Sequence, residues 1–321
     1  MSWLAKKVCV GITLGDPSGI GPSIITQALQ QLQGLAEFVV IGDKWVFNRI
    51  AQSVNRKSQI KFIDLDNVTH KNFKFGKVKA EYGKASIAYL DKALALIKKK
   101  QIDCLVTCPI SKEAVSLAGL PYRGHTEYLA KHYQAQDLVM MLLNEHLRFT
   151  LVTRHIPLKK VSSALNRALL SKTIKITHQS LKRIFLIPNP RIVVCGLNPH
   201  ASDNGLVGRE ENQLIKPVIK ELRQRIKCLR GPIPADVAIS QARHKDYDCV
   251  IALYHDQALI PLKLSGPDSG VNITLGRPFV RTSPLHGTAF DISVYPAKAN
   301  PNSLIAAITL AVRCTLNLKR D

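Results

Sequence analysis

The sequence has no apolar run long enough to cross a membrane. A spanning helix needs roughly 18 to 20 consecutive apolar residues, and the longest helical pattern of the 321-residue chain, near its C-terminus, is too short. The first residues, MSWLAKKVCVGITLG, lead directly into a strand and lack the apolar segment and cleavage site of a signal peptide. We therefore expect a cytoplasmic protein that does not span a membrane.

Cysteine patterns typical of disulfide frameworks or zinc sites are also missing. The seven cysteines contain no CxxC pair and lie mostly inside apolar runs. An odd number of scattered, apolar-flanked cysteines indicates reduced and buried thiols.

Acidic and aromatic residues are scarce. Asp and Glu number 23 against 45 Lys and Arg, which gives a net charge of +22, and aromatic residues make up 6% of the chain. Such a charge is compatible with a nucleic-acid surface. However, the basic residues are dispersed, and no strip combines them with aromatic residues for base stacking. We interpret the charge mainly as a solvated surface that also favours anionic substrates.

No phosphate-binding fingerprint occurs. The segment GDPSGIGPS (15–23) follows the first predicted strand, but its spacing is neither GxGxxG nor that of a P-loop. Two interpretations stay open: its amides and the following helix N-terminus bind an anion, or it is a tight structural turn. Asp16 would then orient a ligand or cap the helix.

Strand-like and helix-like segments alternate along the chain. Apolar runs at 8–14, 191–197 and 249–254 are typical of buried strands, and helical patterns cover 82–100, 168–186, 208–226 and 301–318. The pattern around Asn144 predicts an antiparallel hairpin. This alternation predicts an α/β fold with a mostly parallel sheet, divided into two domains.

Three of the apolar runs are followed by a histidine. FTLVTRH ends at His155, RIVVCGLNPH at His200 and DCVIALYH at His255. Residues just past the carboxyl ends of parallel strands line the ligand crevice of such sheets. Three imidazoles at one edge would hold a divalent cation and leave coordination positions open. The alternative is three unrelated loop histidines.

Further polar residues are candidates for the surroundings of this site. A carboxylate at Asp256 or Asp236 would orient a metal-binding imidazole, unless it only caps a turn. His125 and Thr126, at a glycine turn that opens a helix, would bind an oxyanion, unless Thr126 is only the N-cap. Lys263, Asn272 and Arg281 lie in a stretch rich in Gly, Pro and Thr that is typical of ligand-binding loops.

These segments, taken together, resemble the 4-hydroxythreonine-4-phosphate dehydrogenase family of pyridoxal phosphate biosynthesis. The resemblance covers essentially the whole chain and rests on GITLGDPSGIGPS, TCPISKEAV, GHTEYLA, TRHIPL, VCGLNPH, ALYHDQ, GVNITLGRPFVRTS and HGTAFD, in this order. The chain departs from the family pattern at Ser23, Ser111, Ala258 and Leu206, and ASDNGLVG replaces a glycine-richer segment after His200.

The resemblance implies a fold like that of isocitrate and isopropylmalate dehydrogenases, with two α/β/α domains at 1–126 plus 295–321 and at 127–294. It implies a homodimer whose active site, in the interdomain cleft, is completed by both subunits. It further implies that His155, His200 and His255 bind one divalent metal (Zn, Co or Mg) drawn from both chains. Substrate would be bound by His125, Thr126, Lys263, Asn272 and Arg281, while Asp236 and Asp256 maintain the site.

The resemblance alone implies NAD or NADP as cofactor and 4-phosphooxy-L-threonine as substrate. The catalytic base is not identified. A dehydrogenase of another phosphorylated hydroxy acid, such as phosphothreonate or phosphoerythronate, is the first alternative. Metal-dependent hydrolysis, in which the histidines activate water, is the second. A basic nucleic-acid-binding protein is the third.

Overall fold

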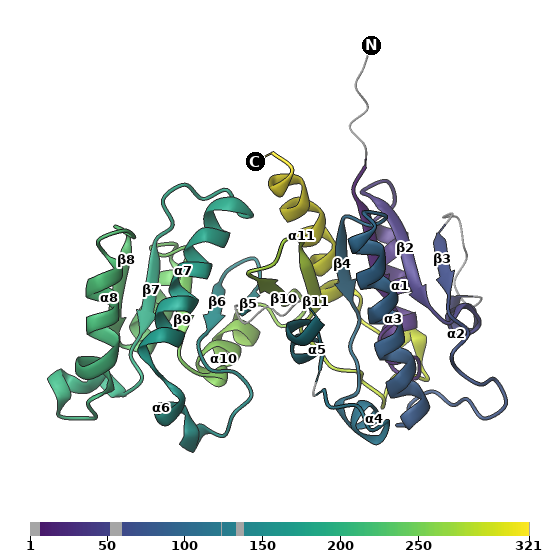
Figure 1. Ribbon diagram of the computed structural model, residues 1–321, viewed down its shortest axis with the longest axis horizontal. Coiled ribbons are helices and arrows are strands. Elements are labelled where there is room, and N and C mark those ends of the chain that lie inside the picture. The colour runs from purple at the N-terminus through teal and green to yellow at the C-terminus, as the bar shows by residue number, and fades with distance from the viewer. Residues whose placement is uncertain (1–6, 52–59, 123, 133–137, 321) are drawn as a thin grey trace, which may run out of the picture. The chain divides into compact units, whose positions relative to one another are not determined.

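The computed structural model describes residues 7–51, 60–122, 124–132 and 138–320. The chain divides into two compact units (Figure 1). The first comprises residues 1–136 with 277–320, and the second comprises residues 137–276.

In the first unit, the strands lie in the order β3-β2-β1-β4-β11, and each neighbouring pair is parallel. Their bounds are β1 Cys9–Thr13, β2 Glu37–Gly42, β3 Lys61–Asp64, β4 Cys104–Thr107 and β11 Arg281–Pro284. The helices are α1 Gly21–Gln31, α2 Lys44–Ala51, α3 Ala80–Lys98, α4 Lys112–Leu117, α5 His125–His132 and α11 Asn302–Leu318. Helix α3 packs on β1 and β2, and α11 packs on β4 and β11.

In the second unit, the order is β10-β5-β6-β9-β7-β8. The strands are β5 Val139–Leu143, β6 Arg148–Leu151, β7 Ile192–Cys195, β8 Leu229–Ile233, β9 Cys249–Ala252 and β10 Val271–Leu275. The pairs from β6 to β8 are parallel, whereas β10–β5 and β5–β6 are antiparallel. The main helices are α6 Val161–Ala164, α7 Arg167–Arg183, α8 Lys216–Leu222, α9 Ala235–Arg243 and α10 His255–Ser265.

This arrangement confirms the predicted fold class, a mostly parallel α/β sheet with helices. The apolar runs become the buried strands because β-branched side chains fill both sheet faces: Val10, Ile12, Val193 and Ile251 are all fully buried. Each such side chain contributes roughly 1.5–3 kcal/mol through removal from water. The predicted hairpin is also present, with Leu143 paired to Arg148 across the Asn144 turn.

The units divide the chain at 136/137 and 276/277, whereas the sequence placed these divisions at 126/127 and 294/295. Two contacts account for the difference. Tyr128 of α5 donates a hydrogen bond to Asp91 of α3, so α5 belongs with the first unit. Strand β11 pairs with β4, which returns the chain to the first unit at this strand, before the last helix.

Two further expectations need correction. Residues 255–265 form helix α10 rather than a ligand-binding loop, although Pro261 lies inside it. The helix expected at 208–226 is interrupted, because a π-helical turn at Glu211–Ile215 precedes α8.

The segment Gly15–Ser23 is a tight structural turn, and most of its N–H groups are bonded within the chain, which disfavours the anion-binding interpretation. The N–H groups of Asp16, Ser18 and Gly19 are bonded within the chain, and that of Ile20 donates to the carbonyl of Thr288. Gly15 has φ +76°, and a Cβ there would lie 2.4 Å from the carbonyl oxygen of Pro109. Asp16 does not cap α1, since its Oδ1 accepts bonds from the N–H and hydroxyl of Ser18.

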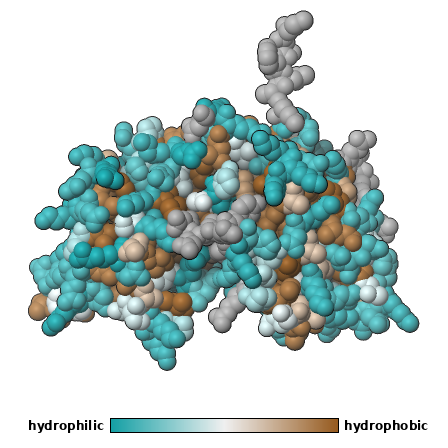
Figure 2. Space-filling view, in the orientation of Figure 1, coloured by the Kyte–Doolittle hydropathy of each residue, from teal (hydrophilic) through white to brown (hydrophobic). Residues whose placement is uncertain are grey.

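Figure 2 shows a face on which hydrophilic residues predominate. Among the described residues, no helix has both the length and the apolar character to pass through a membrane.

Asp16→Asn should change how stability depends on pH. Burial raises the pKa of Asp16 from 3.8 to about 6, so the folded chain holds this proton more tightly than the unfolded chain. Protonation of Asp16 contributes roughly 3 kcal/mol to the free energy of unfolding at pH values below the pKa of Asp16 in the unfolded chain. This contribution is lost as the pH rises through the pKa of Asp16 in the folded chain. Relative to wild type, the unfolding free energy of Asp16→Asn should therefore rise by roughly 2–2.5 kcal/mol between pH 4 and pH 7, which is most of that total. Urea unfolding at both pH values measures this difference, and equal changes in the two proteins would contradict it.

Candidate active site

The three histidines follow three adjacent parallel strands. Strands β6, β9 and β7 lie side by side in that order, and His155, His255 and His200 come after their carboxyl ends. Parallel strands end at the same edge of a sheet, so all three histidines come from one edge of the second unit.

Two of these imidazoles lie close together. The ring centroids of His155 and His255 are 5.5 Å apart, with an angle of 48° between the planes. Nδ1 of His255 is 2.6 Å from Oδ1 of Asp256. A carboxylate that accepts the Nδ1 proton leaves the Nε2 lone pair of His255 available to a metal. Asp256 therefore occupies the orienting position predicted from the sequence.

His200 lies in an unusual turn after β7. Residues 200–204 all have left-handed φ angles, between +42° and +73°, and none is glycine. Within the residues that the structure describes, no three His, Cys, Asp or Glu side chains form a group that could hold a metal. One chain thus brings together His155 and His255, and His200 stays a predicted ligand.

The other predicted residues of the second unit are dispersed over three elements. Asp236 is exposed in the first turn of α9, and Lys263 is exposed in the last turn of α10. Asn272 lies on β10, and its Oδ1 is buried with no hydrogen-bond partner among the described residues. A buried amide oxygen of this kind is available to a donor from a ligand.

In the first unit, the buried guanidinium of Arg281 lies near the half-buried imidazole of His125. Arg281 is 1% exposed, and its Nη2 donates to Oγ1 of Thr107 at the end of β4. Burial, and then the charge of Arg277, lower the pKa of Arg281 to about 9. Burial and the nearby charge of Arg281 lower the pKa of His125 well below its usual range. A buried guanidinium with a second cationic side chain and an imidazole near it favours binding of an oxyanion. The side chain of Thr126 lies outside the described residues.

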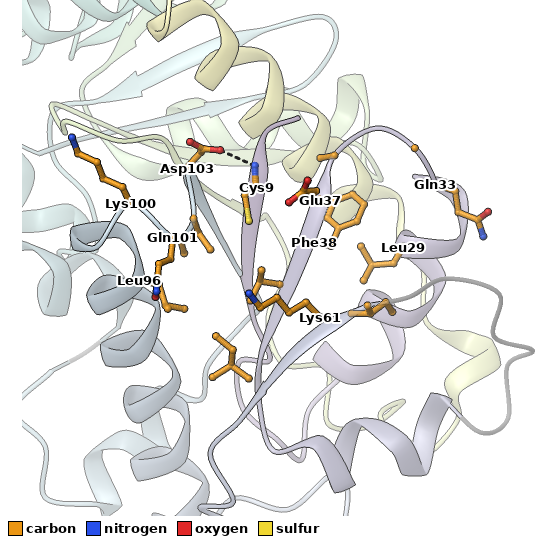
Figure 3. A pocket seen from close by; sticks show the side chains of 16 residues that line it. Cys9, Leu29, Gln33, Glu37, Phe38, Lys61, Leu96, Lys100, Gln101 and Asp103 are labelled. Carbon is orange, nitrogen blue, oxygen red and sulfur yellow. Dashed lines mark hydrogen bonds between the residues drawn. The ribbon is translucent and has the colours of Figure 1, made fainter. Parts of the chain in front are cut away.

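A separate cavity of about 640 Å³ opens at the amino ends of β1, β2 and β3. Figure 3 shows that Cys9, Phe38 and Lys61 line it. The carboxylate of Asp103 is engaged there, since it accepts bonds from the Cys9 amide and from Lys319. The predicted site residues lie elsewhere, and ligands of parallel sheets bind at carboxyl ends. We therefore do not assign this cavity to the active site.

Comparison with known proteins identifies the family. Residues 21–311 match the family model described as pyridoxal phosphate biosynthetic protein PdxA. The chain belongs to this family.

The similarity extends over nearly the full length of the relatives. The 4-hydroxythreonine-4-phosphate dehydrogenase of Sulfurihydrogenibium sp. is 40% identical over 317 residues, which are 95% of this chain and 98% of that protein. The D-threonate 4-phosphate dehydrogenase of Salmonella typhimurium is 39% identical, with the same coverage of both chains. The crystal structure of 4-hydroxythreonine-4-phosphate dehydrogenase from Klebsiella pneumoniae has a TM-score of 0.86 and 36% identity, and covers 98% of this chain and 99% of that one. These family members are dehydrogenases, and this chain is accordingly an oxidoreductase of the PdxA family.

Sequence reasoning missed two sets of neighbours. Thr107 and Arg277 lie next to Arg281, and Thr107 had a signal because it ends a predicted strand at the carboxyl edge. Asn198, which precedes the His200 turn, donates hydrogen bonds to Glu210 and Glu211, which follow it in the chain. Nothing in the spacing of the two glutamates indicated that they face Asn198, because the intervening turn is left-handed.

Arg281→Met should raise the pKa of His125. Removing the nearby positive charge favours the protonated imidazole, although burial still opposes it. Lys131→Met, on an exposed position of the same helix α5, removes the same charge and should leave the pKa of His125 where it is in wild type. Histidine NMR titration of the three proteins measures this, and the same His125 midpoint in all three would contradict the assigned contact.

Ser202→Gly should stabilise the protein by about 1 kcal/mol, because a left-handed L-residue costs roughly 1–2 kcal/mol and glycine adopts it freely. Ser202 has φ +73°, and its buried hydroxyl has no hydrogen-bond partner among the described residues. Ser240→Gly, on the exposed face of α9, should instead destabilise by roughly 0.5–1 kcal/mol. Thermal unfolding of both variants measures this, and a lower melting temperature for Ser202→Gly would contradict the strain.

Proposed function

We propose that this chain oxidises 4-phosphooxy-L-threonine in a metal-assisted, NAD- or NADP-dependent reaction. The secondary alcohol loses a hydride to the nicotinamide and a proton, giving 2-amino-3-oxo-4-phosphooxybutanoate. This 3-oxo acid then loses CO₂ to give 3-amino-2-oxopropyl phosphate for pyridoxal phosphate synthesis. The observation that carries the proposal is the convergence of His155 and His255 at the carboxyl edge, in a chain of a family of dehydrogenases.

The residues of the second unit fit a divalent metal. Two imidazoles with ring centroids 5.5 Å apart, one of them bonded to Asp256, are a donor set that suits Zn²⁺ or Co²⁺. A metal bound there would act as a Lewis acid that polarises the substrate oxygen. Asp256 would keep the Nδ1 proton of His255 in place, so that Nε2 stays the ligand atom.

A second copy of the chain is the proposed source of the third ligand. Among the described residues, one chain brings only His155 and His255 together, and His200 stands on its own turn. The family resemblance implies that the ligands are drawn from both subunits of a homodimer. We therefore propose that His200 completes the site of the partner subunit.

The phosphate and carboxylate of the substrate require cationic and amide groups. Arg281 and His125 would receive an oxyanion, whose negative charge would raise the low pKa of His125 and stabilise its protonated form. Lys263 and the unpartnered oxygen of Asn272 are the further groups that we assign to substrate. Asp236 is assigned to site maintenance by the resemblance alone.

The nicotinamide cofactor rests on the family resemblance. The β1–α1 turn does not fit a pyrophosphate, because its amides are bonded within the chain and its residues are buried. We therefore assign no residue to NAD or NADP.

D-threonate 4-phosphate is the second candidate substrate. The relative from Salmonella typhimurium that is named for it matches this chain about as well as those named for 4-hydroxythreonine 4-phosphate. The two compounds differ at C2, which carries an amine in one and a hydroxyl in the other. Parallel assays of NADH formation with both compounds separate the candidates, and turnover of a phosphorylated compound without any nicotinamide would favour the hydrolase alternative.

His200→Ala should abolish stoichiometric metal binding and NADH formation while the far-ultraviolet circular dichroism stays that of wild type. His244→Ala, which removes an exposed imidazole at the end of α9, is the matched control and should retain both metal and activity. Metal analysis of the purified proteins and a direct absorbance assay provide the two readouts. Full turnover of His200→Ala in the presence of a chelator would exclude the proposed mechanism.

A further inference from the structure

The backbone conformation of the turn that carries His200 is intrinsically unfavourable. Five successive non-glycine residues, 200–204, are left-handed, and L-residues in this region are disfavoured by contact between Cβ and the backbone. Glycine adopts such angles freely, but none of these five residues is glycine. Contacts from outside the turn must therefore stabilise it.

A set of three side chains immediately before and after the turn provides these contacts. We call Asn198, Glu210 and Glu211 the carboxylate clamp. The side-chain amide of Asn198 donates to Oε2 of Glu210 and to Oε2 of Glu211, at 2.9 Å in both cases. Oε1 of Glu211 accepts bonds from the backbone N–H groups of Leu197 and Asn198, both at 2.8 Å. These four bonds act on the segment that leads into Pro199 and His200, while Glu210 is itself held by bonds from the Ser162 hydroxyl and the Arg209 amide.

The main chain closes the turn against the end of β7. The carbonyl of Asn198 accepts the N–H of Ala201 at 3.1 Å. Ala201 packs against Gly196 so closely that a Cβ at Gly196 would lie 2.9 Å from the Cα of Ala201. Asn198, bonded within the clamp, and Ala201, packed against the end of β7, therefore fix the backbone on both sides of His200. The imidazole of His200 itself is exposed.

Glu211 is 0% exposed. Burying a carboxylate is costly unless hydrogen bonds replace its water, and here three N–H donors from residues 197 and 198 do so. The carboxylate of Glu211 therefore restrains the short backbone segment that leads to His200. Asp256 restrains His255 in a different way, through direct contact with Nδ1 of its imidazole.

We propose that Asn198 and Glu211 are positioning residues that hold His200 in the orientation required to bind the metal. This inference rests on the proposed function, because it assumes that His200 is a ligand. The two residues act through the backbone of the turn and contact neither metal nor substrate.

The experiment titrates the metal-free full chain with Co²⁺, using calorimetry for affinity and the visible cobalt absorbance for coordination. Asn198→Ala should weaken Co²⁺ binding by roughly 10- to 100-fold, the usual effect of removing a group that orients a ligand. Glu211→Gln should weaken it less, because its remaining oxygen still accepts the two backbone bonds.

Asp248→Ala is the matched control for stability. Asp248 accepts bonds from the backbone and guanidinium of Arg191, and so joins the opposite, amino ends of β7 and β9. Its loss removes a comparable clamp from the same strands without touching the histidines. This variant should be destabilised in urea yet bind Co²⁺ as wild type does.

A rescue variant tests the proposed cause. Adding Ser202→Gly and Asn204→Gly to Asn198→Ala removes the strain that the clamp opposes, since both positions are left-handed. This triple variant should regain part of the lost cobalt affinity and of the wild-type absorbance. Rescue by glycine at these two positions is not expected of a residue that only stabilises the fold.

The outcomes separate the two proposals. The positioning inference is overturned if a folded Asn198→Ala protein binds Co²⁺ with wild-type affinity, or if Asp248→Ala loses as much Co²⁺ affinity as Asn198→Ala. In both cases the proposed function is still supported, provided that Co²⁺ binding depends on His200. Absence of cobalt binding by wild type, or full-affinity binding by His200→Ala, overturns both.

Discussion

The parallel pairing of β6, β9 and β7 is the constraint on which the candidate site depends. Three strands that run the same way must end at the same edge, so three histidines separated by some fifty residues each come from one place in the fold. The antiparallel strands β5 and β10 lie beyond β6, and β10 carries Asn272. The position of these three histidines is therefore a consequence of strand direction before it is a consequence of any single loop.

Several loops that follow strands in the two units are stabilised by the same kind of hydrogen bond. A side-chain oxygen accepts backbone N–H groups that would otherwise be unpaired, and so fixes a short segment that has no regular structure of its own. The described examples are Asp16, Asp43, Asn144, Glu211 and Gln257. Burial of such groups is less unfavourable when they accept hydrogen bonds, so each one favours the loop conformation that provides its donors.

The candidate site residues of the two units differ in solvent exposure and in charge. Around His155 and His255 the imidazoles are accessible, and Asp256 sets which nitrogen is available to a cation. Around Arg281 the groups are withdrawn from water, and burial is the main cause of the lowered pKa values of Arg281 and His125, with smaller contributions from the charges of Arg277 and Arg281 respectively. The first arrangement suits a divalent metal and the second an oxyanion, and both are needed for a phosphorylated substrate with a reacting alcohol.

The sequence by itself determined the fold class, the hairpin around Asn144, the strand ends that carry the histidines and, through its motifs, the family. These features follow from local hydrophobic periodicity and from residue order, which any single chain displays. The tertiary structure decided the rest: that Gly15–Ser23 is a closed turn, that residues 255–265 are helical, and that Glu211 lies against Asn198. These depend on contacts between residues that only folding brings together, and on a left-handed turn whose strain is tolerated because distant groups stabilise it.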